Sequence, residues 1–404
     1  MSKPLVISFF FTGGDDSKQG LKIYVCNSMK QFDCIIAGAG SAGLTLAYLL
    51  LVNENSKKSI VIIDKDQKTT NDRTWCFWEK GDNLFQHLVF KQWSLASFKS
   101  DFFQKDYNIA PYQYKMIRGI DFYEFMKSEL KKHPNLTWVN ATIQSISEDG
   151  TVHTADDQYV GQLVFDSTKG LNDFSIPKKH VQFLQHFKGY FVETKTAHFD
   201  PEKFTYMDFR IDQKGDCRFG YVLPLSATKA LVEYTIFSET LLTEEEYHDG
   251  VKNYLSEFLN IEEYSITEEE FGVIPMTDFP FPLQNGKVVN IGISGGFAKA
   301  STGFTFLRSQ QILTKIAFNL EKNLAPTDNL PHQSWRFKKY DSTLLKVLQG
   351  GKPMGKEVFA SLFEQNGAQA VFKFLDEETS WMEEMKIMST TPILTFGKAF
   401  LKSI

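Results

Sequence analysis

Three glycines and one acidic residue near the start of the chain have the spacing of a site that binds a dinucleotide. An apolar run ending at Ala37 leads into Gly-x-Gly-x-x-Gly, and Asp64 closes a second apolar run at residues 60–63. The first glycine permits a tight turn, the second lets backbone amides approach a pyrophosphate, and the third lets a helix pack closely on the strand. An acid about 20 residues further on binds a ribose hydroxyl. The residues expected at the nucleotide are Gly38, Ala39, Gly40, Ser41, Ala42, Gly43 and Asp64.

The glycine motif has a second interpretation, because a glycine-rich turn also occurs in ordinary α/β domains. The flanking pattern favours the nucleotide, since a strand precedes the motif, a helix over residues 41–52 follows it, and the acid ends the next strand. The pattern does not itself separate FAD from NAD. Its place at the start of the main domain, with no second copy downstream, favours a tightly held FAD.

Glu233 is the candidate acid of the chain. It lies in Ala230-Leu-Val-Glu-Tyr-Thr235, where the alternation of a strand places Leu231, Glu233 and Thr235 on one face. A carboxyl group on an apolar face is costly unless it is paired or neutral, and burial raises its pKa, which suits a general acid. The alternative is that the opposite face of this strand is buried and Glu233 is solvated.

A second glycine-rich turn follows a strand predicted at residues 288–294. Gly295 and Gly296 precede a helix that is expected to reach about Lys322. Backbone amides at such a turn can receive phosphate or flavin oxygens, although a plain strand-to-helix turn has the same pattern. Asp208 and Arg210 share a face of another strand, and we expect them to form a structural ion pair.

Composition excludes several classes of protein. The net charge of -5 gives no sign of nucleic-acid binding, which usually requires a basic excess. The four cysteines have no paired spacing and no neighbouring histidines, so neither a metal site nor a disulfide framework is expected, and a reducing cytoplasm is the natural home. No stretch approaches the roughly 18 uncharged apolar residues that cross a bilayer. The eight histidines show no hydrolase pattern.

Two apolar features leave alternatives open. The 37 phenylalanines outnumber the 26 glycines, so they build a large core or line an apolar cavity, and the core is favoured for most of them. The stretch 393–404 carries Lys398 and Lys402 but no acid. It either lies in a membrane interface or packs its apolar side on the core as a last helix.

Periodicity divides the 404 residues into segments of an α/β protein with two or three lobes. Thr243-x-x-Glu246 is a capping box that opens a helix through about Phe258. The predicted segments are an N-terminal extension (1–30), an FAD-binding βαβ unit (31–80), the remainder of that domain with inserted strands (81–185), a substrate-binding sheet domain (186–270), a return of the FAD-binding domain (271–330) and a helical C-terminal region (331–404).

Several blocks between residue 32 and about residue 400 together resemble the bacterial lycopene β-cyclases. Their order and spacing are more specific than any one of them. The blocks are the glycine motif, Asp72–Trp78, Leu184–Tyr190, Met207–Arg210, Tyr221–Pro224, Leu231–Thr235, Gly272–Met276, and Gly295–Gly296 with Thr302–Phe304.

The resemblance implies a glutathione-reductase-related, hydroxylase-like flavoprotein with FAD in the first domain and a linear C40 carotenoid in an apolar tunnel beneath the second. It implies an intramolecular lyase or isomerase that converts lycopene through γ-carotene to β-carotene without net redox change. FAD would act in its reduced form, with NAD(P)H as the reductant. Gly295, Gly296, Thr302 and Gly303 would form the second flavin contact.

The resemblance also assigns the functional acid to Glu233. Family members often carry a second acid next to it, whereas this chain has Tyr234. That difference weakens a two-carboxylate mechanism and leaves reduced flavin or Glu233 as the proton donor. A carbocation needs a dry site with electron-rich walls, and aromatic faces attract cations. The residues expected in these walls are Trp75, Phe77, Trp78 and Tyr234.

The expected partner is the carotenoid, without nucleic acid, and the expected location is the cytoplasm, peripheral on the cytoplasmic membrane. The sequence leaves open the oligomeric state, one-end or two-end cyclisation, and β or ε rings. Two rival interpretations remain. One is a flavin monooxygenase or prenyl-chain reductase on the same fold, and the other is a non-catalytic protein that binds carotenoids or lipids.

Overall fold

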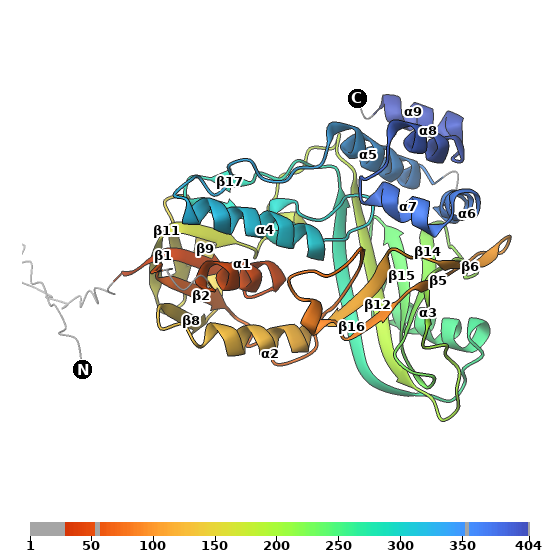
Figure 1. The fold of residues 1–404 in the computed structure, drawn as a ribbon, viewed down its shortest axis with the longest axis horizontal. Helices are drawn as coiled ribbons and strands as arrows, with labels where there is room; N and C mark the ends of the chain where they lie inside the picture. Colours follow the sequence, from red (N-terminus) through yellow and green to blue (C-terminus); the bar gives the residue numbers. More distant parts are fainter. Residues whose placement is uncertain (1–28, 53–56, 352–354, 403–404) are drawn as a thin grey trace, which may run out of the picture.

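The computed structural model describes residues 29–52, 57–351 and 355–402 of the chain. Two sheet-containing parts lie side by side, and a group of C-terminal helices covers the second of them (Figure 1). Residues 1–28 of the predicted extension lie outside the described residues, and the first strand already begins at Lys30. The predicted α/β class, with a βαβ unit, a second sheet and a helical C-terminal part, is confirmed.

The first sheet carries the glycine motif at the end of its central strand. Its strands follow the order β17-β18-β11-β1-β2-β8, and β10 and β9 extend it from β11. β1 pairs in parallel with both β2 and β11, so its apolar residues are buried on both faces. The strands are β1 (Lys30–Ala37), β2 (Ile60–Asp64), β8 (Leu136–Asn140), β9 (Ile143–Ile146), β10 (Thr151–Thr154), β11 (Gln158–Asp166), β17 (Gln284–Asn285) and β18 (Val288–Asn290).

Three helices cover one face of this sheet: α1 (Ser41–Leu51), α2 (Gly119–Leu130) and α4 (Phe306–Glu321). Their apolar sides meet in one core, with Leu44, Met126 and Leu313 among its members. The predicted helix after the glycine motif is therefore present. The helix from the second glycine-rich turn is also present, and it packs beside α1 although they lie far apart in the sequence (Figure 1).

The second sheet has the strand order β16-β12-β15-β14-β13-β5-β6 and is antiparallel except where β13 meets β5. One face packs on α3 (Glu244–Asn253) and a π-helical turn (Tyr254–Phe258). The predicted capping box of α3 is confirmed at Thr243 and Glu246. The strands are β5 (Leu95–Lys99), β6 (Gln104–Asn108), β12 (Gln182–Glu193), β13 (Lys203–Asp208), β14 (Cys217–Pro224), β15 (Lys229–Ser238) and β16 (Ser265–Thr277).

A small third sheet joins the two parts. It consists of β3 (Thr74–Glu79), β7 (Gln113–Arg118) and β4 (Lys91–Trp93), in the order β3-β7-β4. Because strand side chains alternate, Phe77 enters the core of the first part and Trp78 enters the core of the second. β3 therefore fastens the two cores to each other.

The C-terminal helices lie over the other face of the second sheet. They pack on it through Phe359, Phe363 and Phe372. The helices are α5 (Trp335–Gln349), α6 (Gly355–Asn366), α7 (Ala368–Leu375), α8 (Trp381–Ser389) and α9 (Ile393–Leu401), and the short 3-10 turns elsewhere are Gln86–Leu88, Leu171–Asp173 and Gly292–Gly295.

Some boundaries predicted from the sequence differ from the limits of the strands and sheets in the structure. β5, β6 and the start of β12 fall within 81–185 yet belong to the second sheet, and β16 runs through the boundary at 270. The strand predicted at 288–294 ends at Asn290, because Gly292 has a φ of 64° and begins a 3-10 turn. Strands that join a sheet from distant sequence carry no local sign of which sheet they enter.

The predicted ion pair between Asp208 and Arg210 is confirmed, with Arg210 Nε 2.8 Å from Asp208 Oδ1. Tyr254 donates a hydrogen bond to the same carboxylate at 3.0 Å, and its ring lies against Gly220 on β14. A Cβ atom at Gly220 would approach the Tyr254 ring to 2.1 Å. The contact between this sheet face and the turn after α3 therefore requires glycine.

We expect Gly220→Ala to lower the free energy of unfolding by about 1–3 kcal/mol, because the added methyl group overpacks a buried ring. Gly170→Ala is the control, since a Cβ there would meet only Asp173, at 3.8 Å. It should change stability by less than about 0.5 kcal/mol. Denaturant unfolding measures both, and equal stabilities would contradict the packing argument.

Candidate functional site

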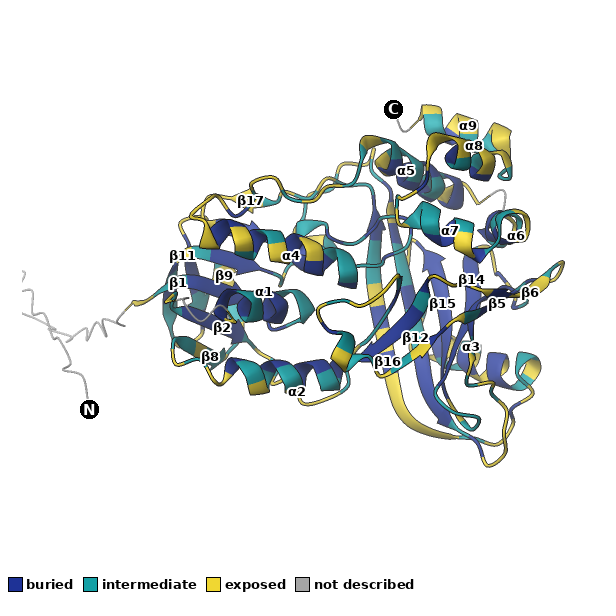
Figure 2. Cartoon of the chain, viewed as in Figure 1, coloured by how far each residue is buried: buried dark blue, intermediate teal, exposed yellow. Residues whose placement is uncertain are grey.

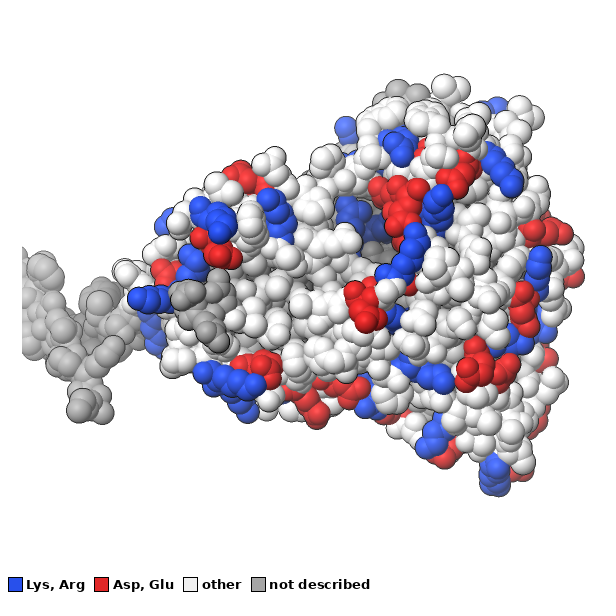
Figure 3. All heavy atoms as spheres, in the orientation of Figure 1, with Lys and Arg blue, Asp and Glu red and all other residues white. Residues whose placement is uncertain are grey.

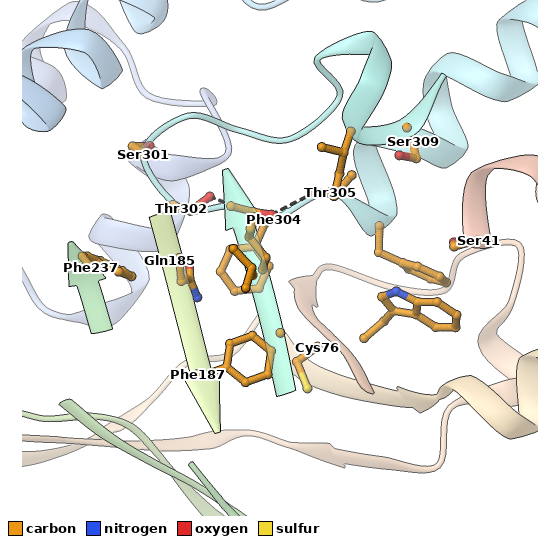
Figure 4. A pocket seen from close by; sticks show the side chains of 18 of the residues that line it. Ser41, Cys76, Gln185, Phe187, Phe237, Ser301, Thr302, Phe304, Thr305 and Ser309 are labelled. Carbon is orange, nitrogen blue, oxygen red and sulfur yellow. Dashed lines mark hydrogen bonds between the residues drawn. The ribbon is translucent and has the colours of Figure 1, made fainter. Parts of the chain in front are cut away.

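A cavity of about 1380 Å³ runs between the two parts of the molecule. The glycine motif lines one end, the second sheet forms a wall, and the C-terminal helices form a roof. Figure 3 shows the surface hollowed at this place, with acidic and basic side chains at its border. In Figure 4, Ser41 lies on one side of the space, and Gln185, Phe187 and Phe304 lie toward the other.

The glycine motif presents an open surface to the cavity. Gly38, Gly40, Ser41, Ala42 and Asp64 line it. A Cβ atom at Gly40 would meet nothing within 4 Å, so space is left free at the N-terminus of α1, where an anion is favoured.

Ala39 and Gly43 support this surface from beneath. Ala39 is buried, and its amide donates to Asp64 Oδ2 at 2.5 Å, while the other Asp64 oxygen accepts from the amide of Asp66. A Cβ atom at Gly43 would lie 2.0 Å from the Gly38 carbonyl oxygen. Asp64 thus holds the glycine loop in place at the edge of the cavity, and Gly43 permits the close approach of α1.

The second glycine-rich turn reaches the cavity through different residues from those predicted. Thr302 and Gly303 line it as expected, but Gly292 and Ile293 line it in place of Gly295 and Gly296. The reason is the 3-10 turn, which places Gly295 against the Asn290 backbone and Gly296 against the Phe281 ring.

A buried polar atom beside this turn has an unused capacity to accept a hydrogen bond from a ligand. Gln185 Oε1 finds no hydrogen-bond partner among the described residues, and it lies close to Gly303 in the cavity lining. An unpaired buried oxygen costs free energy, and a donor group on a bound molecule would satisfy it. Together with the open space at Gly40, this oxygen fits a dinucleotide extending along the cavity.

Glu233 lies in the middle of β15 and faces the cavity with Thr235 and Phe237. Its exposed fraction is 7%, so the buried alternative for this face is confirmed and the solvated one is excluded. Burial raises the pKa of Glu233 well above its usual value, and the neighbouring Glu270 raises it further. Burial and the neighbouring carboxyl group therefore both favour the protonated form of Glu233.

Glu270 is a second carboxyl group that the sequence analysis missed. It lies on β16, separated from β15 by β12, and Gly189 of β12 pairs with Glu233 on one side and Glu270 on the other. Thr74 Oγ1 donates to Glu270 Oε2 at 2.5 Å. The available sequence signal was its place just before Gly272–Met276, a block already recognised in the resemblance.

The aromatic walls are built mostly by residues other than those predicted. Of the four predicted side chains, only Trp75 lines the cavity. Phe77 stacks on Phe306 at 5.1 Å between ring centroids, and Trp78 stacks on Phe372 at 4.8 Å, so both are core residues. Tyr234 lies on the opposite face of β15, where Arg218 donates to its hydroxyl at 3.1 Å.

Strand alternation supplies the actual walls around Glu233. The hydroxyl groups of Tyr114 and Tyr221 lie 2.7 Å apart, and burial raises the pKa of each well above its usual value. Both therefore stay neutral beside the carboxyl pair. The aromatic residues lining this part of the cavity are Tyr114, Phe187, Tyr206, Phe219, Tyr221, Phe237 and Phe304.

The roof of the cavity is apolar as well. Trp335, Trp381, Ile393, Phe396 and Phe400 contribute to it from α5, α8 and α9. No helix in the described part of the chain is long and apolar enough to cross a membrane. Within residues 29–52, 57–351 and 355–402, no cluster of three or more His, Cys, Asp and Glu side chains is arranged to hold a metal ion.

Comparison with known proteins gives a family and a set of relatives. A sequence profile described as "Lycopene cyclase protein" matches residues 33–400. The chain is 25% identical over 333 residues to the chloroplastic neoxanthin synthases of Solanum tuberosum and Solanum lycopersicum, covering 76% of this chain. It spans 64% of the length of these curated relatives.

Solved structures with a similar fold include a geranylgeranyl bacteriochlorophyll reductase-like protein from Thermoplasma acidophilum. Its TM-score is 0.62 at 12% identity, over 92% of this chain and 99% of that one. The flavin-dependent brominase Bmp2 has a TM-score of 0.55 at 12% identity, over 93% of this chain and 94% of that one. At such identities the likeness concerns the fold, which is the predicted one.

Substitutions at two of the three glycines of the motif should have separable effects. Gly40→Ala should leave the unfolding free energy of the protein without nucleotide within about 0.5 kcal/mol of wild type but abolish retention of FAD, since the methyl group enters the open space. Gly43→Ala should lower stability by about 1–3 kcal/mol, because the methyl group meets backbone. Denaturant unfolding and flavin absorbance after gel filtration measure the two effects. A Gly40→Ala protein that keeps FAD would contradict this assignment.

Proposed function

The chain belongs to the lycopene cyclase protein family, and on this basis we propose that it is an FAD-dependent cyclase that closes the acyclic ends of lycopene into β-rings. The observation that carries the proposal is the burial of Glu233 in a wall of aromatic side chains, which favours its protonated form. The same cavity extends to the glycine motif. A long apolar substrate and a nucleotide cofactor would therefore share one cavity.

Glu233 acts as the general acid of the proposed reaction. Its O–H bond breaks as a new C–H bond forms at C2 of the acyclic end, which leaves a cation at C1. The electron pair of the C5=C6 double bond then forms the C1–C6 bond and moves the cation to C5. Loss of the proton from C6 returns an electron pair to the ring as its C5=C6 double bond. Protons and electrons balance, so the reaction has no net redox change.

The aromatic side chains around Glu233 support a cationic intermediate in two ways. Their faces attract positive charge, and this attraction strengthens where water is absent. Their bulk also excludes the water that would trap a carbocation. Phe187, Phe219 and Tyr221 line the cavity near Glu233, and they belong to the strands on either side of β15.

The flavin would be held by backbone and polar groups from both parts of the molecule. The glycine loop and Ser41 would bind its pyrophosphate, and Thr302, Gly303 and Gln185 would contact its further portion. When bound and reduced by NAD(P)H, the flavin supplies an electron-rich ring system that stabilises positive charge. In this function NAD(P)H keeps the flavin reduced and is not consumed with each ring closed.

Expression in cells that accumulate lycopene tests the reaction. Chromatography of the extracted pigment should show γ-carotene and β-carotene with the wild-type chain, and Glu233→Gln should reduce their formation at least about 100-fold. Tyr234→Phe is the matched control, because this neighbour faces away from the cavity, and it should retain activity.

Other outcomes of this experiment point to other functions. Unchanged lycopene together with NAD(P)H consumed in proportion to a modified product would replace the cyclase with a monooxygenase or prenyl-chain reductase. Bound carotenoid that remains acyclic, with Glu233→Gln indistinguishable from wild type, would indicate a binding protein.

An exposed apolar surface on the C-terminal helices supports peripheral attachment to the cytoplasmic membrane, where the substrate dissolves. Figure 2 shows exposed segments on α8 and α9. Met382 on α8 and Leu394 on α9 have exposed fractions of 83% and 82%, and Trp335, Trp381 and Ile393 are exposed as well. The last three also line the cavity, so the substrate would enter between these helices. Lys386, Lys398 and Lys402 on α8, α9 and the α9 C-cap favour anionic lipid headgroups.

The double variant Met382→Asp and Leu394→Asp should therefore lose binding to sedimented anionic phospholipid vesicles. Phe102→Asp is the control, since Phe102 is equally apolar and 74% exposed but lies between β5 and β6, beside Lys356 of α6 and not on α8 or α9. Equal binding of both variants would exclude this surface as the attachment site.

A further inference from the structure

The carboxyl groups of Glu233 and Glu270 meet over a position of strand β12 that has no side chain. This position is Gly189, whose Cα lies between the two residues in the sheet register. A Cβ atom at Gly189 would lie 3.0 Å from Glu233 Cγ and 3.1 Å from Glu270 Cγ. Glycine thus leaves the space in which the two side chains approach each other, and they share a hydrogen bond.

Only one of these buried groups can carry a charge at moderate cost. Two carboxylates in contact repel each other, and burial penalises each of them, so one proton is retained by the pair. Thr74 donates a hydrogen bond to Glu270, and the positive charge of Arg73 also favours its ionised form. The hydroxyl of Thr235 is a long 3.4 Å from Glu233. Burial raises the pKa of Glu270 as well, but these partners favour the negative charge on Glu270 and the proton on Glu233.

We propose that Glu270 is a positioning residue that holds the transferable proton on Glu233 and makes the pair the acceptor of the proton released by the substrate. This inference rests on the proposed cyclase function. It supplies a second carboxyl group from a neighbouring strand, in place of the adjacent acid that Tyr234 replaces in this chain. Tyr234 itself faces α3 and cannot take that part.

The proton cycle closes within the pair. Before reaction the pair holds one proton and one negative charge. Donation from Glu233 to C2 leaves two carboxylates in contact, and their combined charge attracts the substrate cation nearby. The repulsion between them makes the pair strongly basic, so it accepts the proton that leaves C6. The pair then returns to its first state without any oxidant, reductant or external base.

The other ionisable groups around the pair leave this assignment intact. Arg73 also donates to the Phe271 carbonyl at 3.2 Å, which holds its charge beside Glu270. Glu268, on the same strand, opposes the ionised form of Glu270. Cys76, Tyr114 and Tyr221 face Glu233 from β3, β7 and β14, and burial raises the pKa of each, so they remain neutral.

Glu270→Gln tests the proposal through activity. The amide removes the negative charge that raises the pKa of Glu233, so that pKa falls. As the pH is raised, the variant should therefore lose activity at a lower pH than wild type does. We expect kcat at neutral pH to drop at least about 100-fold with KM within threefold of wild type. Glu269→Gln is the control, because this neighbour is exposed and paired with Lys188, and it should behave as wild type.

Unchanged kcat and an unchanged pH profile in Glu270→Gln would overturn the proposal, since Glu270 would then only fill space. A loss of activity caused by misfolding is detected by flavin absorbance and circular dichroism. In that event the infrared comparison of wild type with Glu233→Gln still tests the shared proton, because that comparison does not need a folded Glu270→Gln protein.

Infrared spectroscopy separates this proposal from the cyclase function. The difference spectrum of wild type minus Glu233→Gln at neutral pH should contain the C=O band of a protonated carboxyl group, whether or not lycopene is a substrate. The subtraction removes the contribution of Asp376, whose pKa burial raises to about 7. In Glu270→Gln the band should vanish at a lower pH than in wild type. Absence of the band from the difference spectrum would overturn the shared proton even if the protein cyclises lycopene. A wild-type protein with the band but without cyclisation would reject only the function.

Discussion

A carboxyl group buried against aromatic side chains is the constraint around which this molecule is organised. An isolated carboxylate would be prohibitively costly at the position of Glu233, so the group must be neutral or compensated. The second sheet meets this requirement by bringing Glu270 beside it across Gly189. A glycine in the middle of a long strand weakens the strand, but here it provides the room that the pair requires.

The same constraint explains why the small third sheet matters. On β3, Trp75 and Phe77 stack on Phe306 of α4, and Trp78 stacks on Phe372 of α7. Thr74, at the start of this strand, donates to Glu270. The strand that packs against both cores thus also stabilises the charge of the buried pair. The placement of the first part of the molecule and the ionisation of Glu270 therefore depend on the same strand.

The C-terminal helices complete the enclosure. Their inner side packs on the aromatic face of the second sheet, while α8 is held to α5 by Arg336 and Tyr340, which bind the buried carboxylate of Glu384. The outer side of the same helices is apolar and exposed. Trp335, Trp381 and Ile393 are both exposed and part of the cavity lining. Under the proposed function, this roof would limit water around the carbocation and give a membrane-dissolved substrate an apolar approach to the cavity.

The features that a short stretch of chain can encode were predictable without the structure. The glycine motif, its strand and helix and Asp64 form one contiguous unit. Alternation within β15 placed Leu231, Glu233 and Thr235 on one face, and the structure then showed that Glu233 and Thr235 line the cavity. Only the tertiary structure decided that Glu270 joins Glu233, that Tyr114 and Phe219 form the walls, and that Gly292 takes the place predicted for Gly295 and Gly296. The physical reason is that cross-strand register and the packing of β3 between two cores depend on contacts between segments far apart in the chain. Local periodicity shows which face of a strand is apolar, but it does not show which side chains from other strands will meet there.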